Sequence, residues 1–290
     1  MSTPPSSTPT KVSIIIPHYN YWCGLRLCLD SVLQQSYPKG RTEIIVVDNN
    51  SDRDLEPFKI DYPDVIFVTE MAQGAAHARN KGMTLATGDV FAFIDADCVA
   101  DTNWLREGVK ALGYCDASGG EVLVSMSDAP NGVEMFEKIF AFRQSMYINR
   151  KGFAATANLI VKKSVAKQIG WFVNGVSEDL EWCLRGQALG FCLTFNDNSI
   201  VTHPARGDWS ELTIKWRRLI AERRNGLKGH ILGQRLRWLG LAAITAISFP
   251  PHCWQILRSD RLTDYQSKIK AMLVLVKIRL WRARHMVTVL

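Results

Sequence analysis

The sequence predicts an α/β fold with a mostly parallel central sheet that helices cover on both faces. Short apolar runs rich in β-branched residues alternate with segments whose apolar residues recur at helical spacing. The runs are apolar throughout, which is typical of strands buried on both faces of a parallel sheet. Polar clusters follow three of these strands, and such sheets bind ligands at the carboxyl ends of their strands.

The first elements are marked by their composition and their ends. Val12–Pro17 (VSIIIP) is a β-branched run that a proline stops, so it is predicted to be a buried strand. Trp22–Gln35 carries leucines and a valine at helical spacing and is predicted to be a helix. Glu43–Asp48 (EIIVVD) is a second strand, followed by a polar turn at 49–52.

The alternation continues through the middle of the chain. Val65–Thr69 is predicted to be a third strand and Ala75–Ala86 a helix. Val90–Ile94 (VFAFI) is a fourth strand, and Thr102 can cap a helix that continues to about residue 112. A further strand and a further helix are expected at Glu121–Val124 and Val133–Met146.

Length and composition describe an ordinary globular chain. Of 290 residues, 47% are hydrophobic and 22% are charged, which excludes disordered, collagen-like and small disulfide-stapled proteins. The seven cysteines form no Cys-x-x-Cys pair and are expected to be buried free thiols in a reducing compartment. Residues 1–10 are polar and lack the apolar core of a signal peptide, so they are expected to form a disordered tail on a cytoplasmic protein.

The charge is distributed unevenly along the chain. The net charge is +7, but residues 211–290 hold 16 Lys and Arg against four Asp and Glu, whereas residues 1–210 carry a net charge of −5. A basic segment on an acidic body suggests an anionic partner, such as a membrane surface or a nucleic acid. No known nucleic-acid-binding module is present, so a nucleic acid is not the expected partner.

Acidic side chains follow two of the predicted strands. Asp95 and Asp97 come after an apolar strand and can hold a divalent cation with the phosphates that it bridges, since Mg²⁺ and Mn²⁺ prefer carboxylate and phosphate oxygens. Asp48 can accept hydrogen bonds from a base or a ribose. The alternative for all three is a solvated turn, because Asp and Asn favour turns.

Two further places carry side chains with catalytic chemistry. Glu178 and Asp179 follow Ser177, where they form either the acidic first turn of a capped helix or a general base beside a pocket. His203 precedes Pro204 and is either a structural histidine or a third metal ligand. The sequence contains no Gly-x-Gly-x-x-Gly after the first strand, no P-loop lysine motif and no Gly-x-Ser-x-Gly elbow, which disfavours the protein classes that those motifs mark.

Four motifs in order connect these places to a known family. They are VSIIIPHYN, EIIVVDNNSD, GAAHARNKGMTLATGDVFAFIDAD and SEDLEWCLR. Together they resemble the inverting family 2 glycosyltransferases with the GT-A fold, over roughly residues 11–205. The resemblance implies a GT-A nucleotide-diphospho-sugar transferase domain over 11–225, followed by a basic, amphipathic helical region over 226–290.

The resemblance also implies roles for individual residues. The turn of Pro17, Tyr19 and Asn20, together with Asp48, would hold the nucleoside of a sugar donor. Arg79 would reach the base or the diphosphate of that donor.

The remaining matches concern the metal and the base. The Asp-x-Asp motif, which holds Mn²⁺ or Mg²⁺ on the diphosphate, is matched by Asp95, Ala96 and Asp97. His203 is outside the four motifs and stays the candidate for a third ligand. Asp179 matches the second residue of the family's Glu-Asp pair, after Glu178, and would be the catalytic base.

The chemistry of sugar transfer explains these residue types. A diphosphate leaving group needs a divalent cation as Lewis acid, and a carboxylate takes the proton of the attacking hydroxyl. A single displacement then inverts the anomeric carbon. The expected function is transfer of a sugar from a nucleotide-diphosphate donor to a hydroxyl of a glycan or lipid-linked acceptor, in surface polysaccharide synthesis.

The sequence disfavours two alternatives to this function. Residues 216–219 (WRRL) lack the Gln-x-x-Arg-Trp motif of the processive members, which favours transfer of single sugars over polymerisation. The protein could instead be a nucleotide-sugar-binding scaffold subunit without turnover, but the intact Glu-Asp pair disfavours this.

The C-terminal region is expected to contact the cytoplasmic face of a membrane. Trp238–Leu257 lacks ionised side chains over about the length of a membrane span, but Pro250 and Pro251 interrupt it. Lys268–Leu290 is predicted to be a helix whose apolar face, bordered by basic residues, suits an anionic membrane surface. That face comprises Ile269, Met272, Leu273, Val276, Leu280 and Val287. The alternative is a helix docked on the catalytic domain or on a second subunit.

Overall fold

The computed structural model describes residues 9–225 and 231–289, and within them the chain divides into two compact units. Unit 1 comprises the residues up to 123 together with 143–174 and 178–203. Unit 2 comprises 124–142, 175–177 and the residues from 204 onwards. The domain boundaries expected at 11–225 and 226–290 stay a prediction, and most of the expected tail, residues 1–8, lies outside the described residues.

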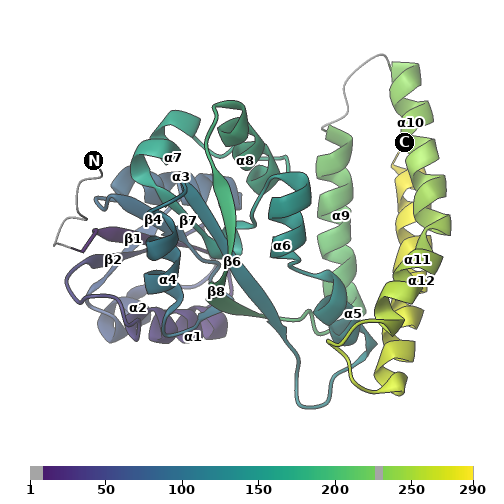
Figure 1. Ribbon diagram of the computed structural model, residues 1–290, viewed down its shortest axis with the longest axis horizontal. Helices are drawn as coiled ribbons and strands as arrows, with labels where there is room; N and C mark the ends of the chain where they lie inside the picture. The colour runs from purple at the N-terminus through teal and green to yellow at the C-terminus, as the bar shows by residue number, and fades with distance from the viewer. Residues whose placement is uncertain (1–8, 226–230, 290) are drawn as a thin grey trace. The chain divides into compact units, whose positions relative to one another are not determined.

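Unit 1 is built on a central sheet, which in the described part of the chain has the strand order β3-β2-β1-β4-β7-β6-β8-β5 (Figure 1). Strands β3, β2, β1 and β4 pair in parallel, whereas the pairs β4–β7, β6–β7 and β5–β8 are antiparallel. The predicted α/β fold is confirmed, but the sheet is mixed rather than mostly parallel, because only those four neighbouring strands pair in parallel. The strands are β1 (Val12–His18), β2 (Thr42–Asp48), β3 (Val65–Thr69), β4 (Val90–Phe93), β5 (Val99–Ala100), β6 (Ala117–Ser125), β7 (Leu159–Lys162) and β8 (Leu193–Pro204).

Helices cover both faces of this sheet, with α1 and α2 on one side and α3 and α7 on the other (Figure 1). Ile15, Ile45 and Phe93 belong to a buried cluster that includes residues of α3 and α7. Ile14 and Ile16, which alternate with Ile15 along β1, are buried as completely. Burial on both faces explains why these strands read as uninterrupted apolar runs. The helices are α1 (Trp22–Leu33), α2 (Glu56–Asp61), α3 (Ala75–Leu85), α4 (Trp104–Ala111), α6 (Gln144–Met146), α7 (Lys163–Ile169) and α8 (Glu178–Ala188), with a π-helical turn at Tyr147–Lys151 and a 3₁₀ turn at Thr156–Asn158.

Two predicted helices begin or end elsewhere than expected. Helix α4 begins at Trp104 and has Asn103 at its N-cap, so Thr102 does not cap it. The segment Val133–Met146 is not one helix, because Phe142 adopts a φ of 45° that a helix cannot contain. The first part, α5 (Gly132–Phe140), starts at a capping box in which Asn131 and Glu134 satisfy each other's backbone N–H groups.

Unit 2 consists of α5 and four helices that follow β8. They are α9 (Trp209–Asn225), α10 (Ile231–Ile247), α11 (Phe249–Leu257) and α12 (Tyr265–Thr288). Pro250 and Pro251 stand in the first turn of α11, where a missing N–H costs little, and they separate α11 from α10 at Ser248. The predicted C-terminal helix is confirmed as part of α12, which packs against α5, α10 and α11. No helix of residues 9–225 and 231–289 combines the length and the apolar character that crossing a membrane requires.

All seven cysteines lie in the described part of the chain and are free thiols. Burial was expected for all of them, but Cys23 and Cys192 are exposed and Cys253 is half-buried. The four buried cysteines are Cys28, Cys98, Cys115 and Cys183.

Candidate active site

The carboxyl ends of β1 and β2 bring His18 and Asp48 together. The two residues are register partners in the sheet, and His18 Nδ1 lies 3.0 Å from Asp48 Oδ1. The backbone N–H of Tyr21 donates to His18 Nε2 at 3.2 Å, so the ring proton is on Nδ1 and is donated to Asp48. Burial lowers the pKa of His18 more than Asp48 raises it, so the ring is neutral at physiological pH. Asp48 is therefore a fixed, buried acceptor at the end of the sheet.

The loops after these two strands are joined by hydrogen bonds. The Asn20 backbone N–H donates to Ser51 Oγ, and the backbone N–H of Asp52 donates to Asn20 Oδ1, both at 2.9 Å. Asn20 has a φ of 51°, which places it in the left-handed region that asparagine tolerates. Next to it Tyr19 is 55% exposed, so its ring is available for stacking. The predicted nucleoside-binding residues thus surround the end of β1, where Pro17 lies within the strand.

Arg79 of α3 joins the two acidic motifs. Its guanidinium is buried and donates from Nη2 to Asp95 Oδ1 at 2.8 Å and from Nη1 to Glu178 Oε1 at 3.1 Å. Burial alone would lower the pKa of Arg79, but the carboxylates of Asp95, Asp179 and Glu178 raise it above its ordinary value. Its Nε is buried and has no hydrogen-bond partner among the described residues. The site therefore contains a fixed cation with one donor still unused.

Asp179, the predicted base, lies in the first turn of α8 and is held by Thr156. The Thr156 hydroxyl donates to Asp179 Oδ1 at 3.0 Å, and the Thr156 backbone N–H donates to Oδ2 at 3.3 Å. Burial raises the pKa of Asp179 to about 6; Arg79 acts against this shift, and the charges of Glu178 and Asp95 add to it. A carboxylate with a pKa near 6 is ionised at neutral pH and still has useful proton affinity, as a general base requires.

The predicted metal ligands fall into two groups rather than one. Asp97 Oδ2 and His203 Nε2 lie 3.0 Å apart, whereas Asp95 is engaged by Arg79 and Ala96 is buried between the two aspartates. No cluster of three or more metal-binding side chains occurs in residues 9–225 and 231–289.

The geometry of Asp97 and His203 nevertheless fits a divalent cation. Two ligand atoms at about 2.1 Å from one ion and at right angles to each other are about 3.0 Å apart, which is the observed separation. Ions of this kind commonly take one or two protein ligands and complete their coordination with substrate phosphates and water. The side chains present therefore fit Mn²⁺ or Mg²⁺ bound together with a phosphate-bearing ligand.

Two contributors to this site, Thr156 and Asn158, lie outside the four motifs. Thr156 is buried and lies in the 3₁₀ turn at Thr156–Asn158, 23 residues before its partner Asp179. Asn158, in the same turn, accepts a hydrogen bond from Trp104 Nε1 at 2.9 Å and donates to the carbonyls of Glu121 and Ser199. These contacts fix the turn that positions Thr156.

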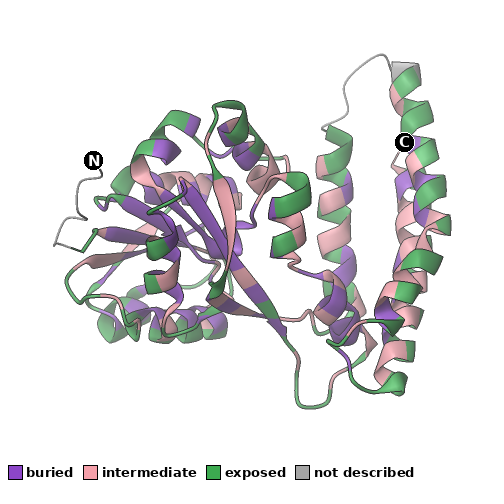
Figure 2. Ribbon diagram, in the orientation of Figure 1, coloured by how far each residue is buried: buried purple, intermediate pink, exposed green. Residues whose placement is uncertain are grey.

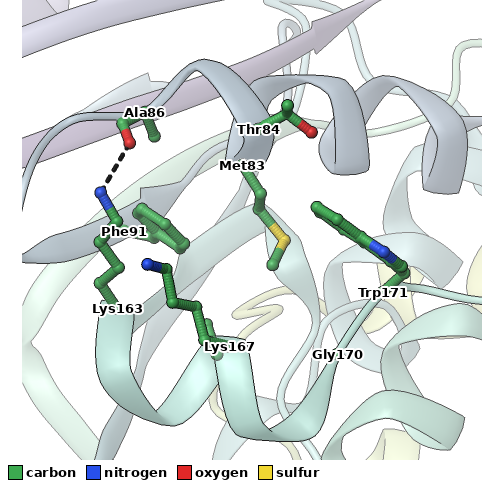
Figure 3. Close-up of a pocket in the computed structure, with 9 residues that line it drawn as sticks. Met83, Thr84, Ala86, Phe91, Lys163, Lys167, Gly170 and Trp171 are labelled. Carbon is green, nitrogen blue, oxygen red and sulfur yellow. Dashed lines mark hydrogen bonds between the residues drawn. The ribbon is translucent and has the colours of Figure 1, made fainter.

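A separate hollow of unit 1, of about 400 Å³, lies among α3, β4 and α7 (Figure 3). Its lining includes Met83, Phe91, Lys167 and Trp171, and Lys163 Nζ donates to the carbonyl of Ala86 at 2.8 Å. Phe91 stands near the start of β4, whereas Asp95 follows the end of that strand. The hollow therefore contains none of the predicted site residues.

Comparisons with known proteins decide the family. The sequence model described as Glycosyl transferase family 2 matches residues 13–170, more than half of the chain. Glycosyltransferase AglE of Haloferax volcanii is 30% identical over 297 aligned positions, which cover 96% of this chain and 94% of that protein. The chain belongs to glycosyltransferase family 2. As a family 2 glycosyltransferase it is an enzyme, and the resemblance that its four motifs show is confirmed.

Solved structures confirm the GT-A fold of this family 2 glycosyltransferase. The mannosyltransferase PcManGT from Pyrobaculum calidifontis, solved with GDP-Man and Mn²⁺, superposes with a TM-score of 0.63 at 18% identity, covering 96% of this chain and 87% of that one. GalNAc-T7, solved with UDP, GalNAc and Mn²⁺, gives a TM-score of 0.54 at 18% identity and covers 69% and 45%. Human polypeptide N-acetylgalactosaminyltransferase 10 is 40% identical over 105 residues, so this chain spans only 17% of that protein.

Proposed function

We propose that this glycosyltransferase moves a single sugar from a nucleotide-diphosphate donor to a hydroxyl group, with inversion at the anomeric carbon. The observation that carries the proposal is the contact of Arg79 with both Asp95 and Glu178, which brings the Asp-x-Asp motif beside the proposed base Asp179. Two structures with the same fold contain a nucleotide sugar or nucleotide together with Mn²⁺, which supports a donor and a metal of the same kinds.

Separate residues of this chain bind the sugar donor and act on the acceptor. Asp48 and the loop containing Asn20 bind the nucleoside, and the Arg79 cation faces the negative charge of the diphosphate. When bound, Mn²⁺ or Mg²⁺ supplies Lewis-acid charge to the leaving diphosphate, and Asp97 and His203 hold it.

Asp179 acts on the acceptor. Its carboxylate takes the proton of the acceptor hydroxyl as the oxygen forms a bond to the anomeric carbon and the bond to the donor phosphate oxygen breaks. Because one displacement occurs, only one protein base is required and the anomeric configuration inverts. Thr156 keeps the carboxylate oriented throughout.

A transfer assay with the full chain tests this function. The chain is incubated with GDP-, UDP- and dTDP-sugars, Mn²⁺ and polyprenyl-phosphate or glycan acceptors, while release of nucleoside diphosphate is followed. We expect one donor to be consumed and the product to show an inverted anomeric signal by NMR. Donor binding without consumption with every acceptor would instead indicate the scaffold alternative, and a retained configuration would contradict the single displacement.

The second part of the proposal is that unit 2 binds the cytoplasmic face of an anionic membrane, where a lipid-linked acceptor for surface polysaccharide would be found. Helix α12 uses one face for packing inside unit 2, and the opposite face is exposed and apolar. The helices of unit 2 carry both buried and exposed residues (Figure 2). The packed face comprises Ala271, Leu275, Ile278 and Met286, and the exposed face includes Ile269, Leu273, Leu280 and Val287.

Helix α10 repeats this arrangement. Its buried residues Trp238 and Ala242 face the core of unit 2, and Trp238 Nε1 donates to the carbonyl of Met286 in α12 at 2.7 Å. Its exposed apolar residues are Leu236, Leu239, Ile244 and Ile247. At 100° per residue, Arg235 and Arg237 fall on the two borders of this exposed stripe.

The positive charge of unit 2 indicates which kind of partner binds these faces. Residues 231–289 contain ten Lys and Arg against two Asp and Glu. A second copy of the chain would bring two sets of cations together, whereas anionic lipid headgroups would neutralise them while the apolar side chains enter the interface. The two interpretations of this region, a helix docked on the protein and a helix at the membrane surface, are therefore compatible with each other. One face of α12 packs in unit 2, and the opposite face would contact the membrane.

A further inference from the structure

A stacked pair in unit 2 contains two buried donors without a hydrogen-bond acceptor in the described part of the chain. The Arg282 Cζ atom of α12 lies 3.5 Å from the centroid of the Trp216 ring of α9. Both side chains are half-buried, yet Arg282 Nε and Trp216 Nε1 are individually buried and have no hydrogen-bond partner among residues 9–225 and 231–289. Buried donors are almost always paired, so two on one stacked pair require an explanation.

The charges around this pair are cationic. Burial, together with the neighbouring charges of Arg279 and Arg223, lowers the pKa of Arg282 to about 9. Arg279 itself donates to Ser248 Oγ at 2.9 Å and lies 3.0 Å from His252 Nε2. Arg282 is still a cation at neutral pH, and no carboxylate of the described residues acts on its pKa.

Glu222, which precedes Arg223 in α9, has other partners. Glu222 lies 3.4 Å from Arg218 Nε, and it accepts a hydrogen bond from the Ser177 hydroxyl at 3.2 Å. The same helix contributes another stacked arginine, since Arg217 Cζ lies 5.8 Å from the centroid of the Trp281 ring. Desolvating a guanidinium beside other cations is unfavourable unless a counter-charge with matching acceptors is present.

We propose that Trp216 and Arg282, with Arg223 and Arg279 beside them, form a binding site for a phosphate group. Phosphate offers several acceptor oxygens and close to two negative charges, so it can pair with the guanidinium and accept from the indole N–H at the same time. A single carboxylate would bring one charge to three arginines. The site lies wholly in unit 2 and does not depend on the proposed sugar transfer.

The first test measures the Trp216 indole directly. The full chain is titrated with inorganic phosphate while indole N–H signals are followed by NMR, and the Trp216 signal is identified by its loss in Trp216→Phe, which retains the aromatic stack. We expect this signal to shift downfield with saturation. In Arg282→Gln the dissociation constant should rise on the order of 10- to 100-fold, whereas Arg284→Gln, an equal charge loss at an exposed position of α12, should leave it within about twofold.

A second measurement guards against an effect on folding. Arg282→Met replaces the guanidinium by an apolar side chain of similar length, so the variant should be at least as stable as the wild type without phosphate. We expect phosphate to raise the melting temperature of the wild type and of Arg284→Gln, with a clearly smaller rise for Arg282→Met.

The source of the phosphate is distinguished with vesicles. Phosphatidylcholine vesicles with and without phosphatidic acid are sedimented with Arg282→Gln and with Arg106→Gln, a matched charge loss at an exposed arginine of unit 1. Weaker binding of Arg282→Gln to the phosphatidic acid vesicles identifies a lipid headgroup, and equal binding of the two variants, together with the indole response, identifies a soluble phosphate. An indole signal that does not move at saturating phosphate, with no Arg282-dependent vesicle binding, would overturn the proposal.

Discussion

Thr156 holds the carboxylate of Asp179 with two hydrogen bonds, one from its hydroxyl at 3.0 Å and one from its backbone N–H at 3.3 Å. These bonds favour the ionised carboxylate, whereas burial favours the protonated one. Burial dominates, and the pKa of Asp179 is raised to about 6. Burial thus outweighs both the charge of Arg79 and the hydrogen bond from Thr156, and the contribution of Thr156 can be changed by itself.

Removing the Thr156 hydroxyl should move the acidic limb of the pH–rate profile. Thr156→Val deletes one bond that lowers the pKa of Asp179, so the pKa should rise from about 6 and the limb of kcat/KM should shift upward by roughly 0.5–1 pH unit. Thr156→Ser retains the hydroxyl and should keep the wild-type limb. Superimposable profiles for all three proteins would show that Asp179 is not the titrating group.

Arg79 should contribute far more to stability than a surface arginine. Arg79→Met leaves Asp95, Glu178 and Asp179 close together without their cation, and we expect the free energy of unfolding in urea to fall by about 3–5 kcal/mol. The control is Arg26→Met, whose ion pair with Asp61 has the same 2.8 Å separation but is about half exposed on both sides. That variant should lose little stability, because solvent screens an exposed ion pair. An equal loss of unfolding free energy in the two variants would mean that the buried ion pairs of Arg79 do not stabilise the site.

The Asp97–His203 pair should determine the metal requirement. In His203→Gln the Mn²⁺ concentration for half-maximal transfer should rise at least tenfold. Mutation of residues that only hydrogen-bond to metal ligands already weakens metal affinity about 10- to 100-fold, and His203 is proposed to be a ligand itself. His285→Gln, which changes a histidine of unit 2, should leave the Mn²⁺ dependence unchanged. An unchanged Mn²⁺ dependence in His203→Gln would remove this histidine from the metal site.

Much of unit 1 could be predicted because its strands are apolar on both faces. β1 to β4 were predicted with their ends within one or two residues for this reason. β8 (Leu193–Pro204) was missed because its first six residues are half-buried or exposed and include Asn196, Asp197 and Asn198, which favour turns. The break between α5 and α6 was missed because it depends on the φ of one residue, Phe142, which composition does not reveal.

The site residues were found as motifs, but their contacts depend on the topology of the sheet. Asp97 meets His203 because β5 pairs with β8 and places Val99 opposite Thr202. Arg79 of α3 meets Glu178 of α8 although the two residues are 99 positions apart in the sequence. Thr156 had no local signal, since its role is set by a partner in another helix.

Membrane binding should depend on the exposed face of α12. Leu273 is 67% exposed, and Leu273→Glu should weaken sedimentation with phosphatidylglycerol-containing vesicles on the order of 10- to 100-fold, because a buried leucine contributes about 1.5–3 kcal/mol. Leu189→Glu makes the same change at a 54% exposed leucine of unit 1 and should have a small effect. Binding should also decline at high salt, because charge screening weakens the contribution of the lysines and arginines. If the two variants bind vesicles equally well, α12 is not the membrane-binding face.

Asp179→Asn removes the base while leaving a side chain that Thr156 can still bind, and its stability serves as the folding control. Because the pKa of Asp179 is about 6 in the folded state and about 3.8 when unfolded, the folded state loses stability as the pH rises between these values. The asparagine variant should therefore melt at a higher temperature than the wild type at pH 7.5, and this advantage should shrink toward pH 4.

Transfer and donor binding by Asp179→Asn, measured side by side, test the central claim most directly. Transfer should fall by about 10²–10⁴-fold while the thermal shift caused by the donor and Mn²⁺ stays within error of the wild type. Full transfer activity in a folded, donor-binding Asp179→Asn protein would contradict the assignment of Asp179 as the catalytic base.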